Sequence, residues 1–178
     1  MATLIIYMTS HGCAEKAAGM IHNLIQGEVT QINLENFETP PLEKFDTVII
    51  GGSIRIGSIQ KKIRKFCEKN IDQLLAKKTG LFICCMFEGD TAIEQFNKAF
   101  PEPLRKNSIA TGLFGGELEF EKMNAFERMI IKQVANISVD VSKFNEQAVK
   151  AFAEKLHITH ITPSPHHLMT SSPNHLIT

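Results

Sequence analysis

Residues 2–14, ATLIIYMTSHGCA, decide the fold. The first part of this segment, residues 2–8, is an apolar run rich in β-branched side chains, which is typical of a buried strand. Thr9, Ser10 and Gly12 then end the run in a tight turn. Apolar side chains recur at helical spacing over residues 14–26 and Gly27 follows them, so a helix is expected directly after the turn. The segment therefore predicts the first strand and helix of a strand–helix–strand unit.

The same alternation continues along the chain. Apolar runs predict four more strands, over residues 29–34, 46–51, 80–86 and 108–114, and helical patterns cover residues 60–76, 91–100, 121–136 and 143–157. Loops are expected at 36–44 and 52–59. Strands joined through helices pair in parallel with right-handed crossovers. The expected fold is an α/β, flavodoxin-like doubly wound sheet of five parallel strands in the order 2-1-3-4-5, with helices on both faces.

Residues 1–157 are expected to form a single domain, because a chain of 178 residues can bury a full core without disulfide bonds. Residues 158–178 contain no Asp, Glu, Lys or Arg and show no periodicity. We expect this segment to be a disordered tail outside the core. Its four histidines would have no fixed ligand geometry, so no metal site is expected there.

Charge and cysteine content exclude several classes of protein. Nineteen Lys and Arg balance nineteen Asp and Glu, so no global positive field would recruit a nucleic acid. The four cysteines lack CxxC spacing, and the adjacent Cys84 and Cys85 would point to opposite faces of a strand, which fits neither a zinc cluster nor a disulfide framework. No run approaches the ~20 apolar residues of a membrane span. A cytoplasmic protein is expected, with peripheral contact to a membrane left open.

Ligands of doubly wound folds bind beyond the carboxyl ends of the strands. The loop after the first strand lies at a helix N-terminus, where free backbone N–H groups and the helix dipole favour a phosphate. Its candidate binding residues are Thr9, Ser10, His11, Gly12, Cys13 and Ala14. A capped turn without a ligand would use the same residue types. The loop lacks the GxGxxG of a dinucleotide site, the GxxxxGK of a P-loop and the acidic residues of a receiver domain.

Two further loops follow the third and fourth predicted strands. The first of them could lie edge-on against the flat ring of a ligand. Alternatively, it could be a simple connection between a strand and a helix, with isoleucines that cap the core. Its candidate binding residues are Ser53, Ile54, Arg55, Ile56 and Gly57. The other loop carries an aromatic side chain that could meet the opposite ring face; its candidate residues are Cys85, Met86, Phe87, Glu88, Gly89 and Asp90.

Three segments together carry a family resemblance: LIIYMTSHG at 4–12, VIIGGSIRIGSIQKKIRKF at 48–66 and MIIKQV at 129–134. They resemble the flavodoxin-domain family that includes menaquinone-dependent protoporphyrinogen oxidase. The resemblance implies non-covalently bound FMN, with its phosphate held by residues 10–14. The isoalloxazine would lie between residues 53–57 and 85–90.

The sequence departs from the family pattern at three places. Ala14 stands where flavodoxins usually have a Thr, and Ile56 stands where an aromatic residue is often found. The segment 87–100 is short and acidic to neutral, whereas the porphyrinogen oxidase has a longer basic insertion there. Porphyrin as the substrate is therefore in doubt.

The resemblance implies an FMN-dependent oxidoreductase that passes electrons from an organic donor to a quinone or similar acceptor. The alternative is a non-enzymatic electron carrier between protein partners. A third hypothesis is a binding module that has lost its cofactor. Because Arg55 lies in the expected ring-binding loop, we expect bound FMN to have a less negative reduction potential than in acidic flavodoxins. A helical stripe of Met123, Phe126, Ile130 and Val134 suits a membrane or quinone-bearing partner, but equally suits a core or dimer face.

Overall fold

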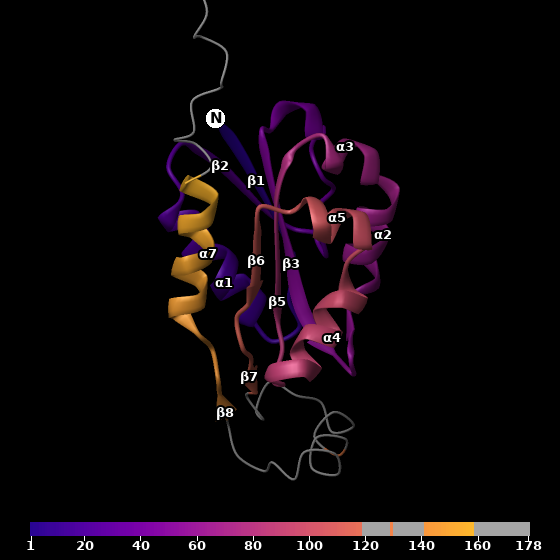
Figure 1. The fold of residues 1–178 in the computed structure, drawn as a ribbon, viewed down its shortest axis with the longest axis vertical. Coiled ribbons are helices and arrows are strands. Elements are labelled where there is room, and N and C mark those ends of the chain that lie inside the picture. The colour runs from indigo at the N-terminus through magenta and orange to yellow at the C-terminus, as the bar shows by residue number, and fades with distance from the viewer. Residues whose placement is uncertain (119–128, 130–140, 159–178) are drawn as a thin grey trace, which may run out of the picture.

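The structure is a computed structural model that describes residues 1–118, 129 and 141–158. Its centre is a parallel sheet in the order β2-β1-β3-β5-β6, which confirms the predicted winding (Figure 1). These strands are β1 (Ala2–Met8), β2 (Glu28–Asn33), β3 (Thr47–Arg55), β5 (Lys78–Cys84) and β6 (Ala110–Leu113). The first strand pairs on both sides, with Ile5 opposite Gln31 on β2 and Ile49 on β3.

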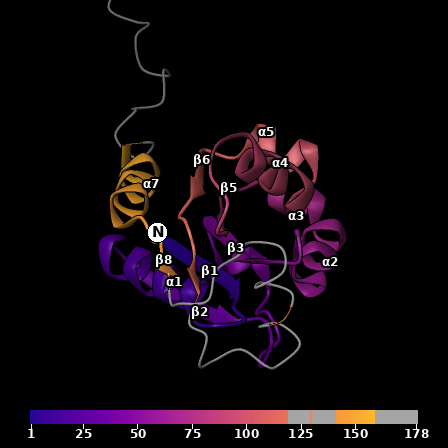
Figure 2. The ribbon, with the colours of Figure 1, turned by 90° about the horizontal axis from the view of Figure 1, so that it is seen from below.

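Helices cover both faces of the sheet (Figure 2). One face carries α1 (Cys13–Leu24) and α7 (Glu146–Ile158), and the other carries α2 (Lys61–Lys69), α3 (Ile71–Leu75), α4 (Gly89–Ala99) and α5 (Glu102–Asn107). Side chains alternate between these layers along each strand, as the strand period of two requires. On β3, for example, Val48 and Ile50 join the core beneath α2 to α5, whereas Ile49 joins the core beneath α1 and α7.

Phenylalanines fill the core beneath α1 and α7. The rings of Phe82 and Phe114 stack with centroids 5.1 Å apart, and Phe152 of α7 meets both of them edge-on. Gly51 makes room for this cluster, because a Cβ at that position would lie 2.2 Å from the Phe82 ring. The adjacent Cys84 and Cys85 fall into different core layers, as the sequence predicts.

Several predictions of local structure need correction. The loop expected at 52–59 is a β-hairpin, because β3 continues to Arg55 and pairs antiparallel with β4 (Ser58–Ile59). Its two-residue turn, Ile56 and Gly57, has positive φ at both positions, as a type I′ turn requires. The single helix expected at 60–76 is interrupted at Asn70, whose side chain donates to the Phe66 carbonyl at 2.8 Å.

Other elements were not predicted. They are the 3₁₀ turn η1 (Leu42–Lys44), helix α5, and the short strands β7 (Glu117–Leu118) and β8 (Val141–Ser142), which pair antiparallel. Helix α4 ends at Ala99, before Pro101, and α5 starts afresh at Glu102, because proline is tolerated in the first turn of a helix. Apart from residue 129, the helix expected at 121–136 lies outside the described residues, as do its stripe from Met123 to Val134 and the tail after residue 158. Within the described part of the chain, no helix is long and apolar enough to cross a membrane.

The buried Cys67 thiol makes the stability of the fold sensitive to alkali. Burial raises the pKa of Cys67 from 9.0 to about 12. The folded state therefore holds this proton more tightly than the unfolded chain, and stability falls as pH rises from about 9 toward 12. Near pH 10.5 we expect the free energy of unfolding to lose about 2 kcal/mol through this thiol. Urea unfolding of the wild type and of Cys67→Ala, at pH 8 and at about pH 10.5, measures this loss. If both proteins lost the same free energy of unfolding between the two pH values, the prediction would be wrong.

Candidate functional site

The carboxyl ends of β1, β3 and β5 meet at one edge of the sheet, which Figure 2 shows from below. A pocket of about 60 Å³ opens at this edge, large enough for a few water molecules. It is lined by Ser10, His11, Cys13, Ser53, Ile54, Arg55, Cys84, Cys85, Met86, Gly116 and Glu117. Each of the three loops singled out in the sequence contributes to this lining.

The first loop is a tight turn that ends at the start of α1. Gly12 adopts a φ of 93°, and its N–H donates to the Thr9 hydroxyl at 2.9 Å. Among the described residues, no side chain caps this helix end. The first-turn amides, including those of Cys13 and Ala14, have no acceptor within the helix, because the acceptors would precede it. The turn thus offers an anion both free amides and the positive end of the helix dipole.

Ala14 contributes to this loop only through its backbone. Its side chain is fully buried in the core between α1 and the sheet. A threonine hydroxyl at this position would lie in that apolar layer. At this departure from the family pattern, the chain thus offers a ligand its backbone amide alone.

The second loop, the β3–β4 hairpin, carries buried polar atoms that need a partner. The Ser53 Oγ is inaccessible to solvent and has no hydrogen-bond partner among the described residues. The side-chain amide of Gln60, just after the hairpin, is also buried and has no hydrogen-bond partner among the described residues. It packs closely on Gly52, where an added Cβ would lie 2.5 Å from the Gln60 Oε1. A buried hydroxyl without a partner costs about 1–3 kcal/mol. Ser53 also lines the pocket, so a ligand there is a candidate partner for its hydroxyl.

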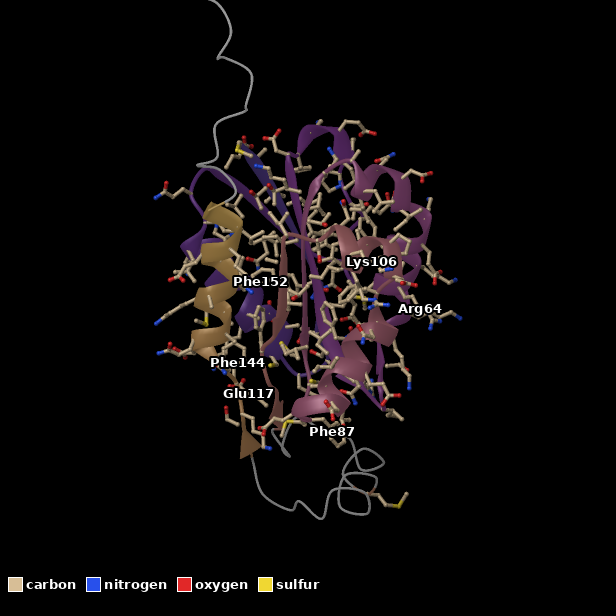
Figure 3. All side chains as sticks on the ribbon, viewed as in Figure 1. Arg64, Phe87, Lys106, Glu117, Phe144 and Phe152 are labelled. Carbon is tan, nitrogen blue, oxygen red and sulfur yellow. The ribbon has the colours of Figure 1, made fainter. Side chains whose placement is uncertain are left out.

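The third loop, between β5 and α4, is anchored by backbone hydrogen bonds. The Cys85 N–H donates to the Gly115 carbonyl at 2.9 Å, and the Cys85 thiol donates to the Phe87 carbonyl at 3.4 Å. Phe87 itself is 50% exposed and lies at the end of the molecule that carries this edge (Figure 3). Glu88 pairs with Lys143 at 3.1 Å.

The predicted site residues divide into two sets. Those that line the pocket are Ser10, His11, Cys13, Ser53, Ile54, Arg55, Cys85 and Met86. Those that lie outside its lining are Thr9, Gly12, Ala14, Ile56, Gly57, Phe87, Glu88, Gly89 and Asp90. Thr9 and Gly12 shape the turn, and Ile56 and Gly57 form the tip of the hairpin.

Sequence reasoning missed a fourth contribution to the pocket, from the segment after β6. Gly116 and Glu117 line the pocket, and a Cβ at Gly116 would lie 2.8 Å from the Met86 Sδ. Glu117 accepts a hydrogen bond from Lys16 at 2.8 Å, which raises the pKa of that lysine. The available signal was the glycine pair at 115 and 116, directly after the strand predicted at 108–114.

The fold and these loops define a protein of the flavodoxin type, as the three sequence segments indicated. A family model described as a flavodoxin domain matches residues 4–144, so the chain belongs to the flavodoxin-domain family. Protoporphyrinogen IX dehydrogenase (quinone) of Escherichia coli strain K12 is 23% identical over 181 residues, covering 93% of this chain and 98% of that enzyme. The same enzyme of Escherichia coli O157:H7 matches to the same extent.

Two solved structures share the fold. A short-chain flavodoxin associated with a non-canonical PDU bacterial microcompartment superposes with a TM-score of 0.53 at 15% identity, covering 89% of this chain and 98% of that one. The flavodoxin of Streptococcus pneumoniae TIGR4 superposes with a TM-score of 0.53 at 13% identity, covering 89% of this chain and 99% of that one.

Proposed function

We propose that this chain binds FMN at the carboxyl edge of its sheet and passes electrons from an organic donor to a quinone or similar acceptor. The observation that carries the proposal is the buried Ser53 hydroxyl, which has no partner among the described residues and belongs to a residue that lines the same pocket as the loop before α1. Membership in the flavodoxin-domain family supports FMN as the ligand. The near full-length similarity to a quinone-dependent dehydrogenase supports the class of reaction.

The residues at this edge fit the two ends of FMN. The phosphate would be held by the amides that open α1, with Ser10 beside them, and the ring by the hairpin and the loop after β5. The pocket of about 60 Å³ is too small to enclose a tricyclic ring, so the ring would need apolar surface outside it. Ile56 and Phe87, which are 74% and 50% exposed, provide such surface directly after lining residues of both loops. When bound, FMN supplies the electron-transfer chemistry.

The cofactor is tested by titrating the ligand-free protein with FMN and with riboflavin. We expect FMN to bind with a shift of the flavin absorbance bands and to bind more tightly than riboflavin, because only FMN carries the phosphate. Protein purified from cells supplied with riboflavin should also be yellow. No binding at millimolar FMN would contradict the proposal.

The two candidate functions, enzyme and electron carrier, can be distinguished by the electron donor that the protein accepts. Incubation with a reduced porphyrin and a menaquinone analogue should give oxidised porphyrin if the chain is an enzyme of the kind its relative is named for. Reduction by a protein reductase alone would favour the carrier. The short segment after β5 leaves other organic donors open.

Arg55 should set the reduction potential of bound FMN. It lines the pocket, and a cation there stabilises the negative charge that a flavin gains on reduction. We expect Arg55→Gln to shift the two-electron potential to a more negative value, and Lys69→Gln, on the outer part of α2, to leave it unchanged. Spectroelectrochemical titration of the three FMN-loaded proteins measures this. Equal potentials for the wild type and Arg55→Gln would reject the role.

A further inference from the structure

Two thiols from distant parts of the chain meet in the pocket. Cys13 is the first residue of α1, and Cys84 is the last residue of β5. Both line the pocket, and both are nearly buried, with exposed fractions of 4% and 2%. The two thiols lie close enough for each to shift the pKa of the other. The Cys13 thiol also donates to the Gly115 carbonyl at 4.0 Å. They share the core layer beneath α1 and α7.

The pair is chemically asymmetric. Interaction with the Cys84 thiol lowers the pKa of Cys13, against the opposing effects of burial and of the Glu117 charge, while the Glu117 backbone and the Lys16 charge assist. The same interaction, together with burial and the neighbouring Cys13, Cys85 and Glu117, raises the pKa of Cys84. Cys13 also lies in the first turn of a helix, a position that favours a thiolate. The pair therefore has a nucleophilic sulfur beside one that keeps its proton.

The other two cysteines lack this arrangement. Cys85 also lines the pocket, but it packs in the opposite core layer and burial raises its pKa to about 11. Cys67 lies in that opposite layer, within α2, away from the pocket lining. Both residues serve as internal controls for any chemistry assigned to the pair.

We propose that Cys13 and Cys84 are a redox-active pair that a small peroxide entering the pocket converts into a disulfide. The Cys13 thiolate attacks one oxygen of hydrogen peroxide, the O–O bond breaks, and hydroxide leaves as water after taking a proton. Cys13 is then a sulfenic acid. The Cys84 sulfur attacks the Cys13 sulfur, the S–O bond breaks, and the oxygen leaves as a second water with the Cys84 proton. In sum, two thiols are oxidised by two electrons and one peroxide is reduced to two waters.

This reaction uses no bound cofactor, so it does not rest on the proposed function. Its consequence for the pocket is structural, since the disulfide ties the N-terminus of α1 to the end of β5. Both of these ends border the pocket. Oxidation would thus change the geometry of the loop before α1.

The test begins with fully reduced, ligand-free protein treated with hydrogen peroxide and then alkylated. Tryptic peptides 1–16 and 79–98 should appear linked, with a mass lower by two hydrogens than their sum, and fragmentation should place the bond at Cys84. Cys13 should be oxidised at least about tenfold faster than Cys67. In Cys84→Ser the link should disappear and dimedone should trap the Cys13 sulfenic acid. In Cys85→Ser the link should persist.

Three results would overturn the proposal: no link between the two peptides in the wild type, a link that fragmentation assigns to Cys85, or oxidation of Cys13 no faster than that of Cys67. Circular dichroism checks that each variant is folded. If Cys84→Ser does not fold, the fragmentation of the wild-type peptides and the Cys85→Ser variant still decide the outcome. Because no flavin is present, failure here is distinguishable from failure of FMN to bind.

Discussion

Replacing Ser10 by Asp should raise the dissociation constant for FMN by at least about 30-fold and leave that for riboflavin nearly unchanged. Ser10 lines the pocket and lies two residues before Gly12, in the turn that leads to the first-turn amides of α1. A carboxylate there would meet the phosphate as a like charge. Two unit charges about 4 Å apart repel by roughly 4 kcal/mol near a protein surface, and half of that value already gives about 30-fold.

The neutral variant Ser10→Asn is the matched control, because it has nearly the same shape as Asp without the charge. It should bind FMN within about threefold of the wild type. Isothermal titration or fluorescence quenching of the wild type and both variants with both ligands gives the dissociation constants. An Asp near a helix N-terminus stabilises the helix by about 0.3–1 kcal/mol, so the melting temperature of Ser10→Asp should not fall. If Ser10→Asp weakened the binding of FMN and riboflavin equally, the phosphate would not lie beside Ser10.

The sheet could be predicted because its strands are uniform. Residues of β1, β3 and β5 are buried on both faces, so each strand is a continuous apolar run that periodicity detects. The same signal placed the three loops at the correct edge, since parallel strands bring their carboxyl ends together. For this reason the pocket lining could be anticipated in large part from the order of strands and helices alone.

The hairpin could not be predicted because its turn breaks the usual residue preferences. A type I′ turn favours Asn or Gly at its first central position, whereas here Ile56 adopts a φ of 47°. The β3–β4 pairing of Ile54 with Ile59, and of Arg55 with Ser58, holds the backbone in this conformation. Tertiary pairing thus overrides a local preference, and the strain lies at the tip of a candidate ligand-binding loop.

The contribution of Gly116 and Glu117 could not be predicted for a different reason. It depends on the connection after β6 approaching the loop after β5, which brings the Gly115 carbonyl to the Cys85 N–H. Long-range backbone contacts of this kind leave only a glycine pair in the sequence. A glycine pair after a strand is therefore a signal to include that loop in a candidate site.

Replacing Phe82 by Ala should lower the free energy of unfolding by about 3–5 kcal/mol, the range for an aromatic side chain removed from a core. Phe82 is fully buried, stacks on Phe114 and meets Phe152 edge-on, so little can collapse into the space that it leaves. Replacing the exposed Phe37 by Ala is the control and should change stability by less than about 0.5 kcal/mol. Urea unfolding followed by circular dichroism measures both.

Gly51→Ala should also destabilise the fold, through the same ring. The new Cβ would lie 2.2 Å from the Phe82 ring carbons, and overpacking of this kind costs about 1–3 kcal/mol. If the clash is the cause, the double variant Gly51→Ala, Phe82→Ala should lose less stability than the sum of the two single losses, because the methyl group then occupies part of the vacated space. Additive losses would instead mean that Gly51 acts through the backbone of β3. A sub-additive result would show that the close contact between this glycine and the ring sets the spacing of β3 and β5, the two strands whose ends border the pocket.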